Sequence, residues 1–406
     1  MNILTLLNVS NLHNIEADSG FIFTRAVAEG VLNVRPGWRF FVVCPPGITF
    51  THPGVIPVNV RYSPTKYQTR FEFDWPGILH TLKRARAAGL SLLWVNQAEQ
   101  AGNLAALVRN LEGRRVPVFT YFHYPSVIRS DEEGVVFDPS LNDWSLGTLV
   151  HLRQYEALVI SDRAAVGSDF ARDLILSSFK RLSLPVHEGK LVSIPPPLDF
   201  RPVSGVSLPP MSDIIVLYNH RLYRHYGTER LIQWIEELRT RSSDSFTLLV
   251  TDPLGQRSPT QERLDSSVSE VRNKLRELLN VQLVSPSNRS EYLEAISSAH
   301  VGLAPFREAP PWSMASVDIM ARGRPLLAPD SGPFPEMLAG RQSLLFGDKE
   351  DFFGKLNRLL TSEESRREEA EYCLRQSARF EIKELSERYA RLFEATANMP
   401  PTSWGR

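Results

Sequence analysis

The chain contains little cysteine, no excess of either charge and no long apolar run. Cys44 and Cys373 are its two cysteines in 406 residues, and they form no CxxC pair. This argues against a disulfide scaffold and a zinc module, and we expect both thiols to be buried as small hydrophobes. Lys and Arg number 46 together, as do Asp and Glu. Any contact with a polyanion must therefore be local.

Several kinds of segment are also missing. No stretch is apolar over the length of a membrane-spanning helix, and residues 3–9 begin the chain as a strand rather than as a basic leader. We therefore expect a cytoplasmic protein without a transmembrane segment. The absence of a GxSxG elbow, a Walker A loop and a GxGxxG fingerprint disfavours a hydrolase, an NTPase and a dehydrogenase. No cluster has metal-ligand spacing, so we expect neither a metal nor a cofactor.

Strand and helix signals alternate along the chain. The strands expected in the first half are residues 3–7, 39–43, 92–96, 116–122, 157–160 and 191–194. Helices are expected between them at residues 21–33, 101–111 and 169–179. The second half repeats the rhythm with strands at 214–218, 246–250, 281–284 and 301–305, and helices at 228–239 and 290–299. This alternation predicts parallel sheets with right-handed crossovers.

Proline marks the boundary between the two halves. Residues 195–197 are three prolines, which cannot continue a helix or a central strand, and residues 202–210 are rich in turn formers. We place the interdomain linker there, between an N-terminal domain of residues 1–200 and a C-terminal domain of residues 201–378. Residues 379–406 are expected to form a C-terminal helix and tail that packs back on the N-terminal domain. A composition of 42% apolar residues can fill two cores.

The most informative segment is residues 301–338, VGLAPFREAPPWSMASVDIMARGRPLLAPDSGPFPEML. A buried strand at 301–305 is followed by a helix that opens near Ser313. Gly323 can end that helix in a left-handed conformation, and residues 325–328 can form the next strand. A helix N-terminus at the carboxyl edge of a parallel sheet offers free amides to an anion. The segment therefore predicts a ligand site.

This segment resembles a known family. Residues 318–325 are similar to the EAMAxGxP element of the retaining nucleotide-sugar glycosyltransferases called GT4, and residues 328–336 to its A-x-D-x-G-x-x-E continuation. The resemblance implies an α/β protein of the GT-B fold, with two Rossmann-like domains facing each other across a cleft. The chain departs from the family where its first glutamate falls on Pro310, with Glu308 the nearby acid. It departs again where the family lysine falls on Tyr226.

The resemblance also implies a donor site in the second half. Arg221 and Gly227 keep the spacing of the family's G-R-x-x-x-x-K-G, with His220 in place of the first glycine. An arginine at a strand end can hold a diphosphate, although a surface ion pair is the alternative. Ser287 and Asn288 fall where the family binds the base, but either residue could instead cap the next helix. The predicted donor-binding residues are Gly20, Arg221, Tyr226, Asp252, Ser287, Asn288, Glu308, Ser313, Met314, Asp318 and Glu336.

Two residues of the first half, Gly20 and His123, are also predicted to lie at the ligand site. Gly20 lets the backbone approach a ligand, or simply joins a loop to a helix. His123 ends a strand similar to the family's P-V-V-x-T-x-H and is predicted to hydrogen-bond the sugar or a phosphate, with a structural histidine as the alternative. The predicted catalytic residues are His123, Arg221 and Asp318.

The implied reaction moves a sugar from a nucleotide diphosphate of the UDP or GDP type to an acceptor hydroxyl, with retention of configuration. Asp318 and Glu336 are expected to accept hydrogen bonds from sugar or ribose hydroxyls. The leaving phosphate is expected to take the acceptor proton. A sugar-nucleotide epimerase of the same fold and a catalytically inactive binding protein are the other function classes.

The acceptor is harder to infer. Residues 61–86 gather cations and flat rings, which a nucleic acid groove needs, and the predicted acceptor-binding residues are Lys66, Arg70, Phe73 and Trp75. They suggest a hydroxymethylated base, as in phage DNA, which must flip out of a duplex to react. In the alternative, the rings belong to the core and the cations to a solvated helix face. The acceptor would then be a cell-surface glycan or a small molecule.

Overall fold

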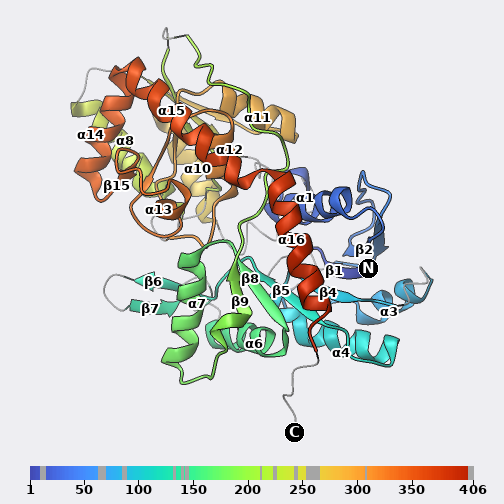
Figure 1. The fold of residues 1–406 in the computed structure, drawn as a ribbon. Coiled ribbons are helices and arrows are strands. Elements are labelled where there is room, and N and C mark those ends of the chain that lie inside the picture. Colours follow the sequence, from blue (N-terminus) through green and yellow to red (C-terminus); the bar gives the residue numbers. More distant parts are fainter. Residues whose placement is uncertain are drawn as a thin grey trace. The chain divides into compact units, whose positions relative to one another are not determined.

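The computed structural model divides the chain into two compact units. It describes residues 1–9, 15–62, 70–84, 89–130, 134–138, 141, 146–210, 213–222, 226–241, 246–252, 266–306 and 309–400. Unit 1 comprises Met1–Asp199 and Ile382–Arg406, and unit 2 comprises Phe200–Glu381 (Figure 1). The sequence placed the boundaries after residues 200 and 378, whereas the units divide after residues 199 and 381.

Unit 1 is built on a seven-stranded parallel sheet with the order β3-β2-β1-β4-β5-β8-β9. Its strands are β1 (Asn2–Leu6), β2 (Arg39–Cys44), β3 (Val55–Asn59), β4 (Leu92–Val95), β5 (Val118–Phe122), β8 (Arg163–Val166) and β9 (Leu191–Ser193). The central strands are buried on both faces, which explains their nearly continuous apolar sequence. A separate hairpin joins β6 (Val127–Ser130) to β7 (Gly134–Phe137).

The helices of unit 1 include one from the far end of the chain. They are η1 (Ile15–Ala17), α1 (Ser19–Val34), α3 (Trp75–Arg84), η2 (Ala98–Gln100), α4 (Ala101–Glu112), α6 (Gly147–Ile160), α7 (Asp169–Arg181), η3 (Glu188–Lys190) and α16 (Ile382–Ala397). Helix α16 lies against α1 so closely that a Cβ at Gly30 would come within 2.1 Å of Ser386 Oγ. Arg35 adds ion pairs to Glu387 and Glu394, at 3.0 and 2.7 Å. These contacts attach the end of the chain to unit 1.

Unit 2 has a six-stranded parallel sheet with the order β12-β11-β10-β13-β14-β15. Its strands are β10 (Ile215–Tyr218), β11 (Thr247–Thr251), β12 (Val281–Val284), β13 (Val301–Leu303), β14 (Leu326–Pro329) and β15 (Leu345–Phe346). Its helices are α8 (Thr228–Arg241), α10 (Ser267–Glu277), α11 (Arg289–Ser297), α12 (Met314–Ala321), α13 (Phe334–Met337), α14 (Lys349–Thr361), α15 (Glu363–Ser377) and η5 (Ala378–Phe380). The predicted parallel α/β architecture in two domains is confirmed.

One predicted strand is wrong. Residues 157–160 form the last turn of α6, and the strand follows at β8. The run Ala-Leu-Val-Ile contains two buried residues, Ala157 and Leu158, followed by Val159, which is 38% exposed. A short apolar run has no periodicity that separates a strand from the end of a helix, so the tertiary packing decides.

Local signals of the second half behave as predicted. Ser313 is the N-cap of α12, and its hydroxyl accepts a hydrogen bond from the amide of Ser316. Gly323 follows that helix with a φ of 66°, in the left-handed region.

Cys44 and Cys373 are both free and buried, as expected, and burial raises the pKa of each thiol to about 12.

Membrane-crossing helices and clusters of metal ligands are both absent from the described residues. None of the helices in these ranges combines the length and the apolar composition that crossing a bilayer requires. Within the same ranges, His, Cys, Asp and Glu side chains form no group of three that could hold a metal ion.

Gly20 is needed where α1 begins. Asp18 caps this helix, and its carboxylate accepts hydrogen bonds from the amides of Gly20 and Phe21. A Cβ placed on Gly20 would lie 1.6 Å from the carbonyl oxygen of Asn8. The glycine therefore allows the helix to begin directly against the end of the first strand, and the Asp18 carboxylate already occupies the helix N-terminus.

We expect Gly20→Ala to lower the free energy of unfolding by at least about 1–3 kcal/mol, because the added methyl group overlaps a backbone oxygen. Urea unfolding monitored by circular dichroism measures the change. Gly37→Ala is the matched control, since a Cβ there meets no atom within 4 Å. Equal stability of the two variants would contradict the close approach.

Candidate functional site

The order of the strands in unit 2 locates the candidate site. β10 is the first strand of the unit, with β11 on one side and β13 on the other, so the connections leave in opposite directions at this point. Open α/β sheets bind ligands beyond the carboxyl ends of such strands. The chain places Asn219, His220 and Arg221 directly after β10, and the loop to α12 after β13.

The start of α12 supplies backbone donors at this edge. The hydroxyl of Ser313 accepts from the amide of Ser316 at 3.2 Å and bonds to the hydroxyl of Ser316 at 2.8 Å. The amides of Met314 and Ala315 precede the first intrahelical bond, so helix geometry leaves them no partner within α12. The first turn can therefore donate to an anion.

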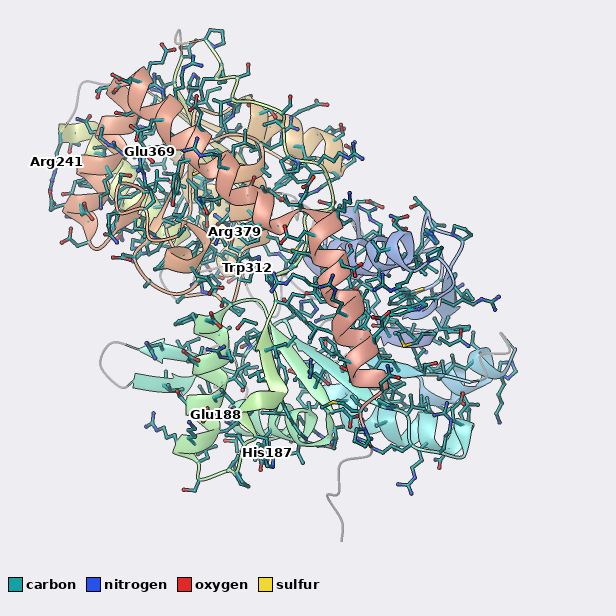
Figure 2. All side chains as sticks on the ribbon, viewed as in Figure 1. His187, Glu188, Arg241, Trp312, Glu369 and Arg379 are labelled. Atoms are coloured by element: carbon teal, nitrogen blue, oxygen red, sulfur yellow. The ribbon has the colours of Figure 1, made fainter. Side chains whose placement is uncertain are left out.

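Aromatic contacts position the loop before α12. The ring of Trp312, next to the N-cap, lies 5.3 Å from that of Phe380 in a T-shaped arrangement. The guanidinium of Arg379 lies over Phe380, and its Nη2 donates to the carbonyl oxygens of Glu336 and Met337. Trp312 and Arg379 are labelled in Figure 2. Glu336 itself is exposed on α13. The helix start and the predicted hydroxyl-binding acid are thus tied to the same segment.

His220 is a buried neutral histidine. Its Nε2 lies 3.0 Å from the carbonyl oxygen of Leu303, which can only accept, so Nε2 carries the proton. Nδ1 is then an acceptor, and it meets no donor within the described ranges. Burial lowers the pKa of His220 to about 3, although the bond to Leu303 opposes the shift. The imidazole therefore stays uncharged at neutral pH.

Tyr226 occupies the position of the family lysine and packs as an aromatic. Its ring centroid lies 5.0 Å from that of Phe306 and 6.1 Å from that of His220. A neutral phenol therefore stands where the resemblance led us to look for a cation. Arg221 is half-buried, and its carbonyl oxygen accepts from the hydroxyl of Tyr218 at 3.4 Å.

Asp318 has a different neighbourhood from the one predicted. Its two carboxylate oxygens accept from the two Nη atoms of Arg289, at 2.8 and 2.9 Å, and its side chain is 4% exposed. The sequence pattern gave no sign of this partner, which opens α11. The expected hydroxyl-binding carboxylate is therefore engaged in a buried ion pair.

The predicted base-binding residues also have partners within unit 2. Asp252 accepts from Arg272 at 2.9 and 2.6 Å and is buried. Asn288 is the N-cap of α11: its Oδ1 accepts from the amide of Glu291 at 3.0 Å, which confirms the capping alternative. The amide of Ser287 donates to the Glu291 carboxylate at 2.8 Å. Glu308 lies outside the described residues.

Unit 1 carries its own polar groups at the corresponding edge. Asn8 and Asn96 follow β1 and β4, where the connections of this sheet reverse. The Nδ2 of Asn8 donates to the carbonyl of Asn96 at 2.9 Å, but the Oδ1 atoms of both are buried and meet no donor in the described part of the chain. His123 is half-buried after β5, with its ring 4.5 Å from that of Phe23 and 4.7 Å from that of Tyr121.

Arg70 and Phe73, two of the four residues predicted to bind a nucleic acid acceptor, are buried. Arg70 is buried, its guanidinium lies 4.4 Å from the ring centroid of Tyr124, and its Nε lies 3.9 Å from Glu99. Phe73 is buried and packs 5.2 Å from Tyr62. Both side chains therefore belong to the interior of unit 1. Arg70 is buried next to a carboxylate and an aromatic ring instead of being exposed to a phosphate. Trp75 is half-buried at the start of α3, and Lys66 lies outside the described residues.

Comparison with known proteins is consistent with this geometry. Residues 201–375 match the family model described as Glycosyl transferases group 1. The chain has the GT-B fold. Searching the curated proteins gave no match.

Solved structures with the same fold align along nearly the whole chain. A sucrose-phosphate synthase from Thermosynechococcus elongatus is 18% identical with a TM-score of 0.71, over 97% of this chain and 98% of that one. A UDP-forming α,α-trehalose-phosphate synthase from Burkholderia xenovorans is 13% identical with a TM-score of 0.65, over 98% and 99%. An E. coli trehalose-6-phosphate protein bound with UDP-2-fluoro glucose is 12% identical with a TM-score of 0.66, over 99% and 100%.

The buried imidazole of His220 predicts a dependence of stability on pH. In the unfolded chain His220 takes up a proton near the ordinary histidine pKa of 6.5, whereas in the folded chain its pKa is about 3. The free energy of unfolding should therefore fall as pH is lowered from 7 to 5, and His220→Asn should reduce that fall. Urea unfolding at about pH 7 and pH 5 measures it. His187 is exposed (Figure 2), so His187→Asn is the control and should keep the wild-type dependence of the unfolding free energy on pH. The wild-type dependence in His220→Asn would contradict a buried neutral imidazole at residue 220.

Proposed function

We propose that this protein is a glycosyltransferase that moves a sugar from a nucleoside diphosphate to the hydroxyl of a small polar acceptor, with retention of configuration. One observation carries the proposal: Arg221 follows β10, and the backbone amides at the start of α12 follow the neighbouring strand β13. Both lie within the region matched by the family model. A cation and free amides at neighbouring strand ends suit a diphosphate. One structural neighbour has UDP-2-fluoro glucose bound, which supports a nucleotide sugar as the donor.

In the proposed reaction, the bond between the anomeric carbon and the diphosphate oxygen breaks while the acceptor oxygen bonds to the same face of the sugar. The acceptor proton passes to a phosphate oxygen, and the nucleoside diphosphate leaves. Arg221 and the amides of Met314 and Ala315 stabilise the charge that develops on the leaving group. Glu336, exposed on α13, accepts from sugar hydroxyls, and the backbone around Ser287 receives the base. Because Tyr226 is neutral, the arginine and the helix start carry most of this stabilisation.

A small hydroxylated acceptor is favoured by unit 1. Buried oxygens without a donor cost about 1–3 kcal/mol each, so the Oδ1 atoms of Asn8 and Asn96 suit a molecule that brings hydroxyl groups. His123 adds a ring nitrogen at the same edge of the sheet. Two of the structural neighbours are by name synthases of sugar phosphates. We therefore place sugars and sugar phosphates first among the acceptors.

Replacing the arginine after β10 tests the donor site. We expect Arg221→Ala to lower kcat/KM by about a hundredfold to a thousandfold, because the leaving diphosphate loses a charge-assisted donor. Release of nucleoside diphosphate is measured with UDP and GDP sugars and sugar phosphate acceptors, and NMR of the product reads the anomeric configuration. Arg375→Ala, at an exposed position of α15, is the control.

The same assays separate the alternatives. Wild-type rates in Arg221→Ala, or an inverted product, would contradict the mechanism. Formation of an epimer of the donor without any acceptor would indicate an epimerase. Donor binding without turnover under every acceptor would indicate a binding protein.

A hydroxymethylated base in DNA is the second acceptor to test, since Arg61 and Lys83 are exposed. We expect no tight, salt-dependent DNA binding, which fluorescence anisotropy with hydroxymethylated DNA at low and high salt measures. We also expect Arg70→Ala to lower the free energy of unfolding by roughly 3 kcal/mol, because it leaves Glu99 buried without its cation. Urea unfolding measures this loss. Tight binding that weakens with salt and is lost in Arg61→Ala would overturn the small acceptor.

A further inference from the structure

The ion pair between Arg289 and Asp318 is an enclosed polar contact at the donor edge of unit 2. Arg289 is the first residue of α11, and Asp318 lies one turn into α12. Two parallel hydrogen bonds of 2.8 and 2.9 Å join them, and their side chains are 16% and 4% exposed. Such a two-point contact specifies distance and orientation together, which a single surface contact does not.

Aromatic rings hold the guanidinium in place. Its central carbon lies 5.0 Å from the ring centroid of Tyr292, in the same helix, and 5.3 Å from that of Phe200. Stacking on aromatic faces and a bidentate carboxylate use the geometry that distinguishes arginine from lysine. The cation therefore has little freedom to leave Asp318 for a ligand.

The pair continues into the end of β10. The hydroxyl of Tyr292 accepts from Asn219 Nδ2 at 2.8 Å, and the same Nδ2 donates to the carbonyl oxygen of Ala315 at 2.9 Å. Ala315 belongs to the first turn of α12, and Asn219 stands two residues before Arg221. A connected set of side chains thus joins the start of α11, the first turn of α12 and the strand end that carries Arg221.

We propose that Asp318 and Arg289 are a positioning pair, which sets the first turn of α12 relative to Arg221 and does not itself contact the donor. The inference rests on the proposed function and departs from the hydroxyl-binding role expected for Asp318. A carboxylate held by two guanidinium nitrogens and nearly closed to solvent is poorly placed to accept from a ribose or a sugar. Displacement of an anchoring element by a fraction of an ångström is enough to weaken an anion site.

The test separates contact from positioning by removing ligand hydroxyls. Isothermal titration calorimetry compares UDP with 2′-deoxy- and 3′-deoxy-UDP, and GDP with its deoxy analogues, on the wild type and on Asp318→Asn. We expect Asp318→Asn to weaken the parent nucleotide and its deoxy analogues by the same factor, about tenfold, because the loss falls on the diphosphate. A larger loss for the parent nucleotide would show that Asp318 contacts the ribose, and would overturn the proposal.

A second variant keeps the test valid if a lone buried arginine disturbs folding. The double variant Asp318→Asn, Arg289→Gln replaces the charges by two amides that can hydrogen-bond across the same gap. We expect it to regain most of the lost affinity, whereas a direct contact through the carboxylate predicts no recovery.

Glu369→Gln is the matched control. Glu369 (labelled in Figure 2) is a buried carboxylate of unit 2 on α15. It pairs with Arg341 and Arg358 at 3.0 and 3.1 Å. We expect this variant to lose stability but to keep wild-type affinity under conditions where it is folded. An equal loss of affinity in Glu369→Gln would reduce the effect to general loosening and overturn the positioning role. Absence of UDP and GDP binding in the wild type would instead overturn the proposed function itself, before any variant is compared.

Discussion

The position of β10 in the sheet of unit 2 is the constraint on which the candidate site depends. Because β11 and β13 pair with opposite sides of this strand, the connections diverge beyond its carboxyl end. Arg221 follows β10, and the amides at the start of α12 follow β13. A cation and a helix N-terminus are therefore brought to one edge by topology, before any side chain contributes specificity.

Buried polar pairs then determine how that edge is used. Arg289 holds Asp318, Arg272 holds Asp252, and Asn219 bridges the hydroxyl of Tyr292 and the carbonyl of Ala315. Each pair joins neighbouring elements of unit 2, so much of the polarity near the strand ends supports the scaffold. Backbone amides, Arg221 and Glu336 are the groups through which we propose that a donor is recognised.

The sequence predicted the elements better than the partners. Apolar runs and caps located α1, α7 and α12 to within a few residues, because burial and capping act over short distances along the chain. The partners of Asp318 and Arg70 were missed because Arg289 and Glu99 lie 29 residues away in each case, and no local pattern encodes such pairs. The strand predicted at residues 157–160 was wrong for a second reason, since a short apolar run fits a strand and a helix end equally.

Hydrogen–deuterium exchange with and without UDP-glucose or GDP-mannose tests the central claim most directly. The account predicts that one of these sugar nucleotides slows exchange at the amides of residues 219–221 and 313–316 in unit 2. Binding that protects other segments and leaves both of these unchanged would contradict it.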